Sequence, residues 1–305
     1  MPEDGTEGAD HMLDPKIKTL LKVVETGNYT QAAKALNLTQ PAVSQHIKAL
    51  ETELHVKLFE RAGNHLVLTR EGNTVVDYAR TMMSLYRNLQ SNLADEASGT
   101  LSLNIGITHT MESNRISEVF AKYASANSGV SIKLITGTQN ILKNRLKNYE
   151  LDFAIIDGKV TDPQLHSMQL DMDSLMLVAA PNHPLTKKSI VTVNDIKKEK
   201  LILRLPDSGT RNLFIASLES QNMSIDEFDV MLAMDNVATI KDLIRHGYGV
   251  SVLAKSACQD ELKKKKLTAL PIENLSMIRE INIVYGDNFK YPELLQEIVR
   301  IYNED

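Results

Sequence analysis

The feature that most constrains this fold lies near the N-terminus, where the hydrophobic pattern predicts three helices separated by tight turns. In the first, an apolar residue returns every three or four positions, as in an amphipathic helix. This stripe consists of Ile17, Leu20, Leu21 and Val24. Gly27 and Asn28 can end the helix, because both tolerate left-handed backbone geometry. Thr30 can cap a short second helix over residues 31–36, and a tight turn is expected at residues 37–38.

The third helix carries most of the functional argument. Thr39 is its expected N-cap, and Pro41 lies just inside, where the missing N–H group of proline costs nothing. Apolar residues at spacings of four, three and four define its buried side. These are Val43, Ile47, Leu50 and Leu54. The helical periodicity turns Gln45, Lys48 and Thr52 to the opposite side, which we expect to be exposed.

The exposed side has the chemistry needed to read base pairs in a major groove. A glutamine amide can bond an adenine edge twice, a serine hydroxyl can bond several bases, and alanine can contact a thymine methyl group. Ala42 and Ser44 flank this side near the helix start, where the helix dipole and Lys48 favour phosphates. The alternative is a surface helix in any small bundle. The short second helix and the tight turn favour a DNA-binding helix-turn-helix.

Residues 27–51 resemble the winged helix-turn-helix signature of the LysR-type transcriptional regulators, and the resemblance continues through residues 54–61 and 68–72. It implies a set of base-contacting positions and a second set that positions the helix on the DNA backbone. The base-contacting positions are Gln40, Pro41, Ala42, Ser44 and Gln45. The backbone-positioning residues are Thr30, Thr39 and Lys48.

A wing is expected over residues 60–69, with Arg61 near its start. Ala62 and Asn64 stand where many relatives have arginine, so we expect less contact between this wing and DNA. Gln45 also replaces an arginine found in many relatives, which indicates a changed base preference.

A long helix is predicted from a cap at Thr69 to about Leu93. Its apolar residues alternate between spacings of four and three, which is a heptad seam. The seam consists of Val75, Ala79, Met82, Tyr86, Leu89 and Leu93. A helix lying on its own domain is the alternative. The resemblance implies a linker helix that pairs with its twin in a homodimer, with a tetramer as the larger assembly, and residues 94–99 are expected to form a hinge. Such a dimer suits an imperfect inverted repeat in double-stranded DNA, and RNA polymerase is a further candidate partner.

From residue 100 the pattern changes to alternating strands and helices. The order over residues 101–156 predicts a mainly parallel sheet, which binds ligands at the carboxyl ends of its strands. A second unit follows, and a last strand and helix return to the first. Strands of the second unit are expected at 175–180, 201–205 and 249–253. The expected fold is therefore a winged helix-turn-helix and linker helix joined to an α/β domain of two subdomains. Subdomain I would comprise residues 100–164 and 268–305, and subdomain II residues 165–267.

This half resembles the effector-binding domain of the LysR family, which has the type 2 periplasmic-binding-protein fold. The matching pieces are Leu151–Ile156, Pro181–Leu185 and Gly247–Leu253. The resemblance implies that a cleft between the subdomains binds a small effector. From subdomain I we expect Thr108, His109, Thr110, Gly137 and Thr138 to line it.

Across the cleft, residues 204–211 look like a motif found in part of the family, Arg-Glu-Pro-Gly-Ser-Gly-Thr-Arg. It would place hydroxyl groups, free N–H groups and a positive charge at a helix start, which suits an anion. The residues concerned are Ser208, Gly209, Thr210 and Arg211. Leu205 and Asp207 depart from the motif, and Asp207 adds negative charge there. A capped helix without a ligand is the alternative.

Composition excludes several classes of protein. The chain has a net charge of −5, yet residues 12–94 hold ten Lys and Arg against seven Asp and Glu, which weakly supports a phosphate-facing domain there. Cys258 is the single cysteine, so no intramolecular disulfide is possible and a cytoplasmic location is expected. No membrane-spanning run, signal peptide, metal-ligand spacing or catalytic motif is found. Residues 1–11 are expected to be an expression leader, with a native tail as the alternative.

The sequence therefore predicts a DNA-binding transcriptional regulator that senses a small, anionic metabolite and has no catalytic residues, cofactor or metal. A regulator of the same family without ligand control is the first alternative. A solute-binding protein is the second, but it leaves residues 15–70 unexplained.

Overall fold

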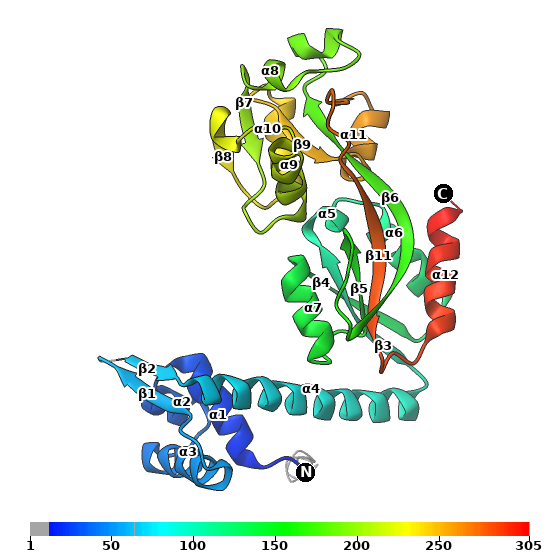
Figure 1. The fold of residues 1–305 in the computed structure, drawn as a ribbon. Helices are drawn as coiled ribbons and strands as arrows, with labels where there is room; N and C mark the ends of the chain where they lie inside the picture. Colours follow the sequence, from blue (N-terminus) through cyan, green and yellow to red (C-terminus); the bar gives the residue numbers. More distant parts are fainter. Residues whose placement is uncertain (1–11, 64, 305) are drawn as a thin grey trace. The chain divides into compact units, whose positions relative to one another are not determined.

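The computed structural model describes residues 12–63 and 65–304, which form two compact units that divide within one helix, between Ala94 and Asp95. The expected leader and Asn64 lie outside the described residues. The elements of the first unit are labelled in Figure 1. They are α1 (Pro15–Thr26), α2 (Tyr29–Ala35), α3 (Gln40–Leu54), β1 (Phe59–Ala62), β2 (His65–Leu68) and α4 (Arg70–Ser98).

The first unit is a three-helix core with a β-hairpin wing. The core comprises Leu20, Val23, Ala32, Ala33, Val43, Ile47, Leu50, Leu58, Val76 and Ala79. The helices α2 and α3 are joined through Asn37, which has a left-handed φ of 55°. The strands β1 and β2 pair antiparallel, from Phe59 opposite Leu68 to Ala62 opposite His65. The predicted helices and tight turn are confirmed.

Two local predictions in this unit were wrong. The cap of α2 is Asn28, whose side chain accepts hydrogen bonds from the N–H groups of Thr30 and Gln31, so Thr30 lies inside the helix. Asparagine is at least as good an N-cap as threonine. The helix therefore begins after Asn28 and not after Thr30. Leu54, predicted on the buried side of α3, is 44% exposed, because the helix ends there and His55 turns left-handed at φ 54°.

The predicted hinge at residues 94–99 is helical up to Ser98, and the chain turns at Gly99, with φ 66°. Residues 94–97 are Ala-Asp-Glu-Ala, and alanine and glutamate are strong helix formers. The carboxylate of Asp95 accepts hydrogen bonds from the Ser102 N–H at 2.8 Å and from the hydroxyls of Ser102 and Thr100, each at 3.0 Å. These bonds fix the last turn of α4 to the start of the following strand.

The second unit alternates strands and helices (Figure 1). Its elements are β3 (Leu101–Thr108), α5 (His109–Glu112), α6 (Ile116–Ala126), β4 (Val130–Gly137), α7 (Gln139–Lys147), β5 (Phe153–Asp157), β6 (Leu165–Ala179), η1 (Pro184–Lys187), α8 (Val193–Ile196), β7 (Lys200–Leu203), α9 (Gly209–Glu219), η2 (Ile225–Glu227), β8 (Asp229–Ala233), α10 (Val237–Arg245), β9 (Ser251–Ala254), η3 (Ser256–Cys258), α11 (Gln259–Lys263), β10 (Thr268–Leu270), β11 (Ile278–Gly286) and α12 (Pro292–Asn303).

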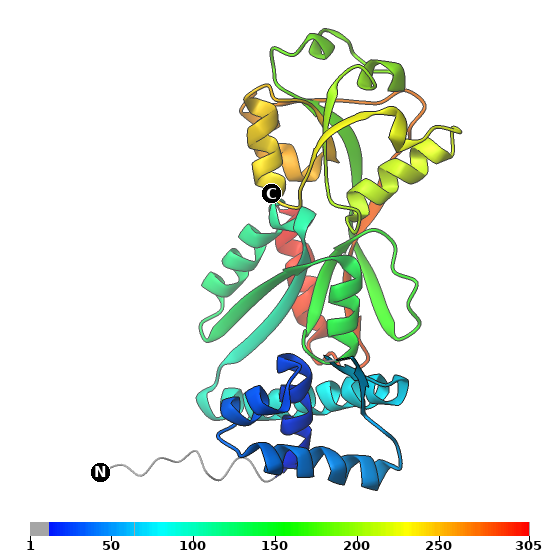
Figure 2. The same ribbon diagram turned by 90° about the vertical axis from the view of Figure 1, so that its left-hand side faces the viewer.

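The strands form a mixed sheet in the order β10-β6-β11-β5-β3-β4, with β9 also paired to β6. The strand β3 is parallel to β4 and β5, whereas β11 is antiparallel to β5 and β6. In subdomain II, β7 and β8 form a separate parallel pair. The two long strands β6 and β11 run together from one subdomain into the other (Figures 1 and 2).

The subdomain boundaries differ from those predicted. The strand β6 begins in subdomain I, where residues 165–174 pair with β11, and only residues 175–179 pair with β9 and β10. The short β10 and residues 272–277 pack in the core of subdomain II. The crossings therefore lie near residues 174–175 and 277–278. The first half of β6 is rich in polar residues, so the hydrophobic pattern did not predict a strand there. The strand β8 was also not predicted.

Each subdomain has a core of its own. In subdomain I, Phe120 and Phe153 lie beside the isoleucines of β3, β5 and β11, and in subdomain II Phe214 and Phe228 pack edge to face. No helix among residues 12–63 and 65–304 is long and apolar enough to cross a membrane.

Gly72 allows the first turn of α4 to pack against the backbone of the wing. A Cβ atom at this position would lie 2.1 Å from the carbonyl oxygen of Leu58, a clash that no side-chain movement can relieve. We expect Gly72→Ala to lower the free energy of unfolding of the first unit by about 1–3 kcal/mol. Hydrogen exchange of the α1 and α3 amides in urea measures this. The exposed substitution Arg80→Ala serves as control, and equal protection in the two variants would contradict the packing argument.

Candidate DNA-binding face and effector site

The start of α3 is organised as the sequence predicts. Thr39 has an extended backbone and its hydroxyl oxygen accepts a hydrogen bond from the Ala42 N–H at 3.4 Å, with Pro41 in the first turn. The remaining N–H groups of this turn point out of the helix end, where the helix dipole places positive potential. The end of α3 is therefore suited to phosphate.

The burial of one side of α3 fixes what the other side presents. Val43 and Ile47 are buried in the core with α1 and α2. The exposed residues are Thr39, Gln40, Pro41, Gln45 and Lys48, and Ala42 and Ser44 are half-buried. The side chains expected to contact DNA thus share the side of the helix that faces away from the core.

A groove of about 300 Å³ connects the start of α3 with the wing. Thr30 lines it from α2, Gln40 from α3, and Arg61 and His65 from the two wing strands. Residues from three separate parts of the predicted site therefore meet at one surface, and Asn28 and Tyr29 join them. Tyr29 stacks edge to face on Phe59 of the wing, with ring centroids 6.1 Å apart.

The predicted seam of α4 is divided in the structure: Met82, Leu89 and Leu93 are exposed, whereas its first residues are covered. Val75 and Ala79 pack on the core of the first unit and Tyr86 is half-buried. The exposed apolar stripe consists of Tyr78, Met82, Leu85, Leu89 and Leu93. The first turns of α4 lie on their own domain, as the alternative interpretation held, and an unpartnered stripe remains farther along the helix.

In subdomain I the predicted effector residues lie at the carboxyl ends of β3 and β4. The hydroxyl of Thr108 donates to the carboxylate of Asp157, and Thr110, two residues later, is buried. Thr138 caps α7 by accepting from the Ile141 N–H at 3.5 Å, so it has a structural role. His109 is half-buried and Gly137 is buried.

In subdomain II the start of α9 has free hydrogen-bonding capacity. Ser208 is its N-cap, but its side chain makes no capping hydrogen bond. The hydroxyl of Thr210 lies 3.4 Å from that of Thr110, so predicted residues of the two subdomains meet at Thr210. Arg211 instead donates from Nη1 to the carbonyl oxygen of Arg204, at 3.1 Å.

Comparison with known proteins decides the family. The family model described as the bacterial regulatory helix-turn-helix protein of the lysR family matches residues 16–73, and the LysR substrate binding domain matches residues 95–304. This chain belongs to the LysR family. It is a LysR-type transcriptional regulator with a helix-turn-helix domain and an effector-binding domain, as the sequence predicts.

Relatives match this LysR-type regulator over nearly its whole length. The HTH-type transcriptional regulator CysL of Bacillus subtilis is 26% identical over 283 residues, which cover 91% of this chain and 93% of CysL. The structure of full-length CbnR with its target DNA has a TM-score of 0.68 at 18% identity, covering 95% and 98% of the two chains. The regulatory domain of Synechocystis CcmR in complex with 2-PG has a TM-score of 0.59 at 20% identity, covering 66% of this chain and 97% of that domain. At these identities the two structures show a shared fold.

Sequence reasoning missed the buried charges at the centre of the LysR-type effector domain. Arg279 of β11 is 7% exposed, forms an ion pair with Asp157 and donates from Nη1 to the Thr210 hydroxyl at 3.2 Å. Asp173 of β6 lies 3.6 Å from the same guanidinium and accepts from the Ser256 N–H and hydroxyl. The available signal was Asp157, a charged residue at the end of the otherwise apolar strand β5.

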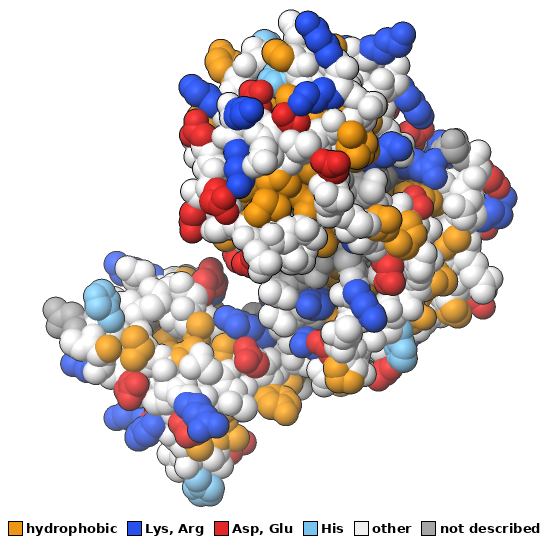
Figure 3. Space-filling model, turned by 45° about the horizontal axis from the view of Figure 1, so that its top comes forward, with side chains coloured by type: hydrophobic (Ala, Val, Ile, Leu, Met, Phe, Trp, Pro, Cys, Tyr) orange, Lys and Arg blue, Asp and Glu red, His pale blue; other side chains and the backbone are white. Residues whose placement is uncertain are grey.

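The possible metal ligands and the lysine run of this LysR-type regulator show no sign of a further site among the described residues. Among the described residues, no group of three or more His, Cys, Asp or Glu could hold a metal ion. Lys263 to Lys266 are exposed, and Lys264 pairs with Asp260 at 3.3 Å, as on a solvated surface. Positive and negative side chains also alternate over the face of the effector-binding domain in Figure 3.

Cys258 is fully buried, and burial raises the pKa of its thiol to about 12. At pH 8 roughly one thiol in ten thousand is therefore ionised, and the thiolate is the reactive form. We expect the folded protein to react with an aromatic disulfide reagent over hours, and the urea-unfolded protein within minutes. Because the chain has one cysteine, absorbance of the released thiol measures this. Rapid stoichiometric labelling of the folded protein would contradict the burial of Cys258.

Proposed function

We propose that this LysR-type regulator binds an imperfect inverted repeat in promoter DNA as a homodimer, and changes transcription when a small anionic metabolite binds its effector-binding domain. The exposed polar side of α3 is the observation that carries the DNA-binding part. Gln40, Ser44 and Gln45 read bases, while Thr39 and Lys48 position the helix on phosphates. Arg61 and Thr30 contact the backbone beside the groove to the wing.

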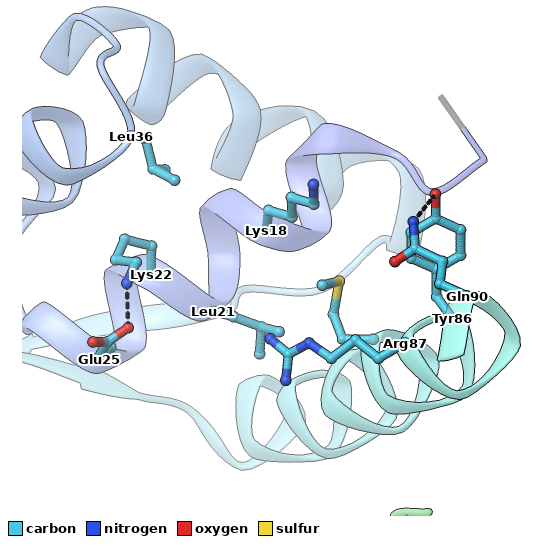
Figure 4. Close-up of a pocket in the computed structure, with 9 residues that line it drawn as sticks. Lys18, Leu21, Lys22, Glu25, Leu36, Tyr86, Arg87 and Gln90 are labelled. Carbon is cyan, nitrogen blue, oxygen red and sulfur yellow. Dashed lines mark hydrogen bonds and ion pairs between the residues drawn. The ribbon is translucent and has the colours of Figure 1, made fainter. Parts of the chain in front are cut away.

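The dimer is supported by the exposed stripe of α4, since soluble monomers rarely expose a continuous row of large apolar side chains. Beside the stripe, α1 and α4 form a pocket of about 380 Å³. Figure 4 shows Leu21 of α1 beside Arg87 of α4, with Lys18 and Lys22 along the same α1 helix. Pairing of two linker helices would bury this row. A tetramer and contact with RNA polymerase are expected from the family alone.

An anionic effector is supported by the start of α9, where the Ser208 hydroxyl makes no capping bond and the first backbone N–H groups have no acceptor within the helix. Thr108, His109, Thr110, Gly137 and Thr138 line the opposite side, and Ser208, Gly209, Thr210 and Arg211 bind the anion. That CcmR was solved with 2-PG supports ligand binding by this type of domain. Ligand binding changes the relative population of open and closed forms and so alters how dimers assemble on DNA. Such a regulator acts in the cytoplasm, where it meets its DNA.

Replacing the central reading residue tests the DNA-binding proposal. We expect Gln45→Ala to lose about 1–3 kcal/mol of discrimination at one base pair and to bind other site variants as before. Lys48→Ala is the matched control, because loss of a phosphate contact weakens binding to all sites equally and lowers the salt slope by about one. Fluorescence anisotropy with operator variants at several salt concentrations measures both. If Gln45→Ala leaves base preference unchanged, α3 does not read bases through this residue.

A charge in the α4 stripe tests the dimer. We expect Leu89→Glu to weaken dimerisation by at least about thirtyfold, because a leucine contact of about 2 kcal/mol is lost and a carboxylate is buried. Ser91 is exposed on another side of the same helix, so Ser91→Glu adds the same charge there and should leave the dimer intact. Sedimentation equilibrium gives the two dissociation constants. Equal dimerisation of both variants would show that the stripe is not the interface.

A further inference from the structure

The guanidinium of Arg204 is buried with most of its hydrogen-bonding capacity unused. Arg204 directly follows β7 and is 3% exposed. Within the described part of the chain, its ion pair runs from Nη2 to Asp235 Oδ1, at 3.3 Å. Nε and Nη1 are buried and have no acceptor among the described residues. A buried N–H group without an acceptor costs about 1–3 kcal/mol of folding free energy. Acceptor oxygens of a ligand would remove this cost at Arg204.

Asp235 is a weak partner for this charge. Its side chain is 39% exposed, and the contact of 3.3 Å is longer than the 2.7–2.9 Å typical of a charge-assisted hydrogen bond. Burial lowers the pKa of Arg204 and Asp235 opposes this shift, yet an arginine stays protonated at any physiological pH. The charge of Arg204 is therefore neutralised in part by the partly exposed Asp235, while Asp157 and Arg279 act on it from farther away with opposite signs.

The surroundings of Arg204 point to an oxyanion. Arg204 and Asp235 follow the two parallel strands β7 and β8, and ligands bind at the carboxyl ends of such strands. Four residues after Arg204 comes Ser208, the N-cap of the 11-residue helix α9, whose hydroxyl makes no capping bond. Arg211, in the first turn of α9, also has a buried Nε without an acceptor among the described residues. Unused donors from a side chain, a hydroxyl and a helix start are thus gathered within one loop.

We propose that Arg204 is the charged anchor for an oxyanionic group of the effector, a carboxylate or a phosphate, and that Asp235 occupies this anchor in the ligand-free protein and is displaced when the oxyanion binds. This inference rests on the proposed function, since it concerns the same effector site. It adds a residue outside the set expected to bind the ligand, and a carboxylate of the protein that competes with the ligand.

The N-terminus of α10 can stabilise the carboxylate of Asp235 after it leaves Arg204. It precedes Asn236, the N-cap of α10, whose side chain accepts from the Thr239 N–H at 2.8 Å. A carboxylate at a helix N-terminus is stabilised by the helix dipole, so Asp235 can leave Arg204 at little cost. Exchange of one carboxylate for another also leaves the net charge around Arg204 unchanged when the ligand carries a single negative charge.

Simple oxyanions test the anchor in the full-length protein. Sodium phosphate and sodium acetate are titrated at constant ionic strength, with sodium chloride as reference, and thermal shift and calorimetry report binding. We expect Arg204→Gln to weaken oxyanion binding by at least about thirtyfold, as for one partner removed from a buried charge pair. Asp235→Asn should tighten it by about three- to tenfold, because the competing carboxylate is gone. The exposed pair Arg245 and Asp242, 2.9 Å apart in the same subdomain, provides the controls Arg245→Gln and Asp242→Asn, which should change nothing.

Each outcome decides the proposal. Stabilisation by phosphate alone or by acetate alone identifies the group that the anchor accepts. Equal binding by wild type and Arg204→Gln, or no oxyanion binding by wild type, overturns the anchor, and weaker binding by Asp235→Asn overturns the competition. If Arg204→Gln does not fold, as judged by circular dichroism, Asp235→Asn still decides. A neutral compound that binds wild type and Arg204→Gln equally would leave the proposed sensing function standing, and operator binding tests the regulator independently.

Discussion

One buried charge holds the two halves of the effector-binding domain together. Arg279 lies on β11 next to the crossing near residues 277–278, pairs with Asp157 of subdomain I and donates to Thr210 of subdomain II. Arginine keeps its charge in proteins, and a buried charge without partners is strongly destabilising. The domain must therefore keep Asp157 and Thr210 near this guanidinium. The position of α9 relative to β5 follows from that requirement as much as from apolar packing.

The partners of Arg279 come from both subdomains. Asp157 and Asp173 pair with Arg279, while Thr108 donates to the other oxygen of Asp157 and Ser256 donates to both oxygens of Asp173. Arg204 has one ion pair, with the partly exposed Asp235, and the carboxylate of Asp157 also acts on its charge. Both arginines keep buried N–H groups without a hydrogen-bond acceptor among the described residues, so the number of paired carboxylates distinguishes them, not the presence of free donors.

Local patterns predicted the local structure, and contacts distant in sequence were beyond them. The stripe from Ile17 to Val24 and the cap at Thr39 depend on neighbours along the chain, and both are found as predicted. The pairing of Asp157 with Arg279 joins residues more than 100 positions apart, which no helical or strand periodicity reports. The long β6 was half missed because polar residues are tolerated on the exposed face of an antiparallel strand. The predicted α4 seam divides between the core of the first unit, which takes Val75 and Ala79, and the exposed stripe, which keeps Met82, Leu89 and Leu93. Periodicity gives the spacing of an apolar stripe but not the partner that covers it.

The helix α4 continues through residues where the sequence predicts a hinge. A flexible hinge at residues 94–99 would absorb a rotation of subdomain I, because glycine and polar linkers bend at little cost. Instead, Asp95 in the last turns of α4 is bonded to Thr100 and Ser102 at the start of β3. The strand β3 is the central parallel strand of subdomain I, paired with both β4 and β5. Gly99, whose backbone is left-handed at φ 66°, lies between the bonded end of α4 and this strand. The bonds of this one carboxylate hold the end of α4 and the start of β3 together where the sequence predicts a flexible hinge.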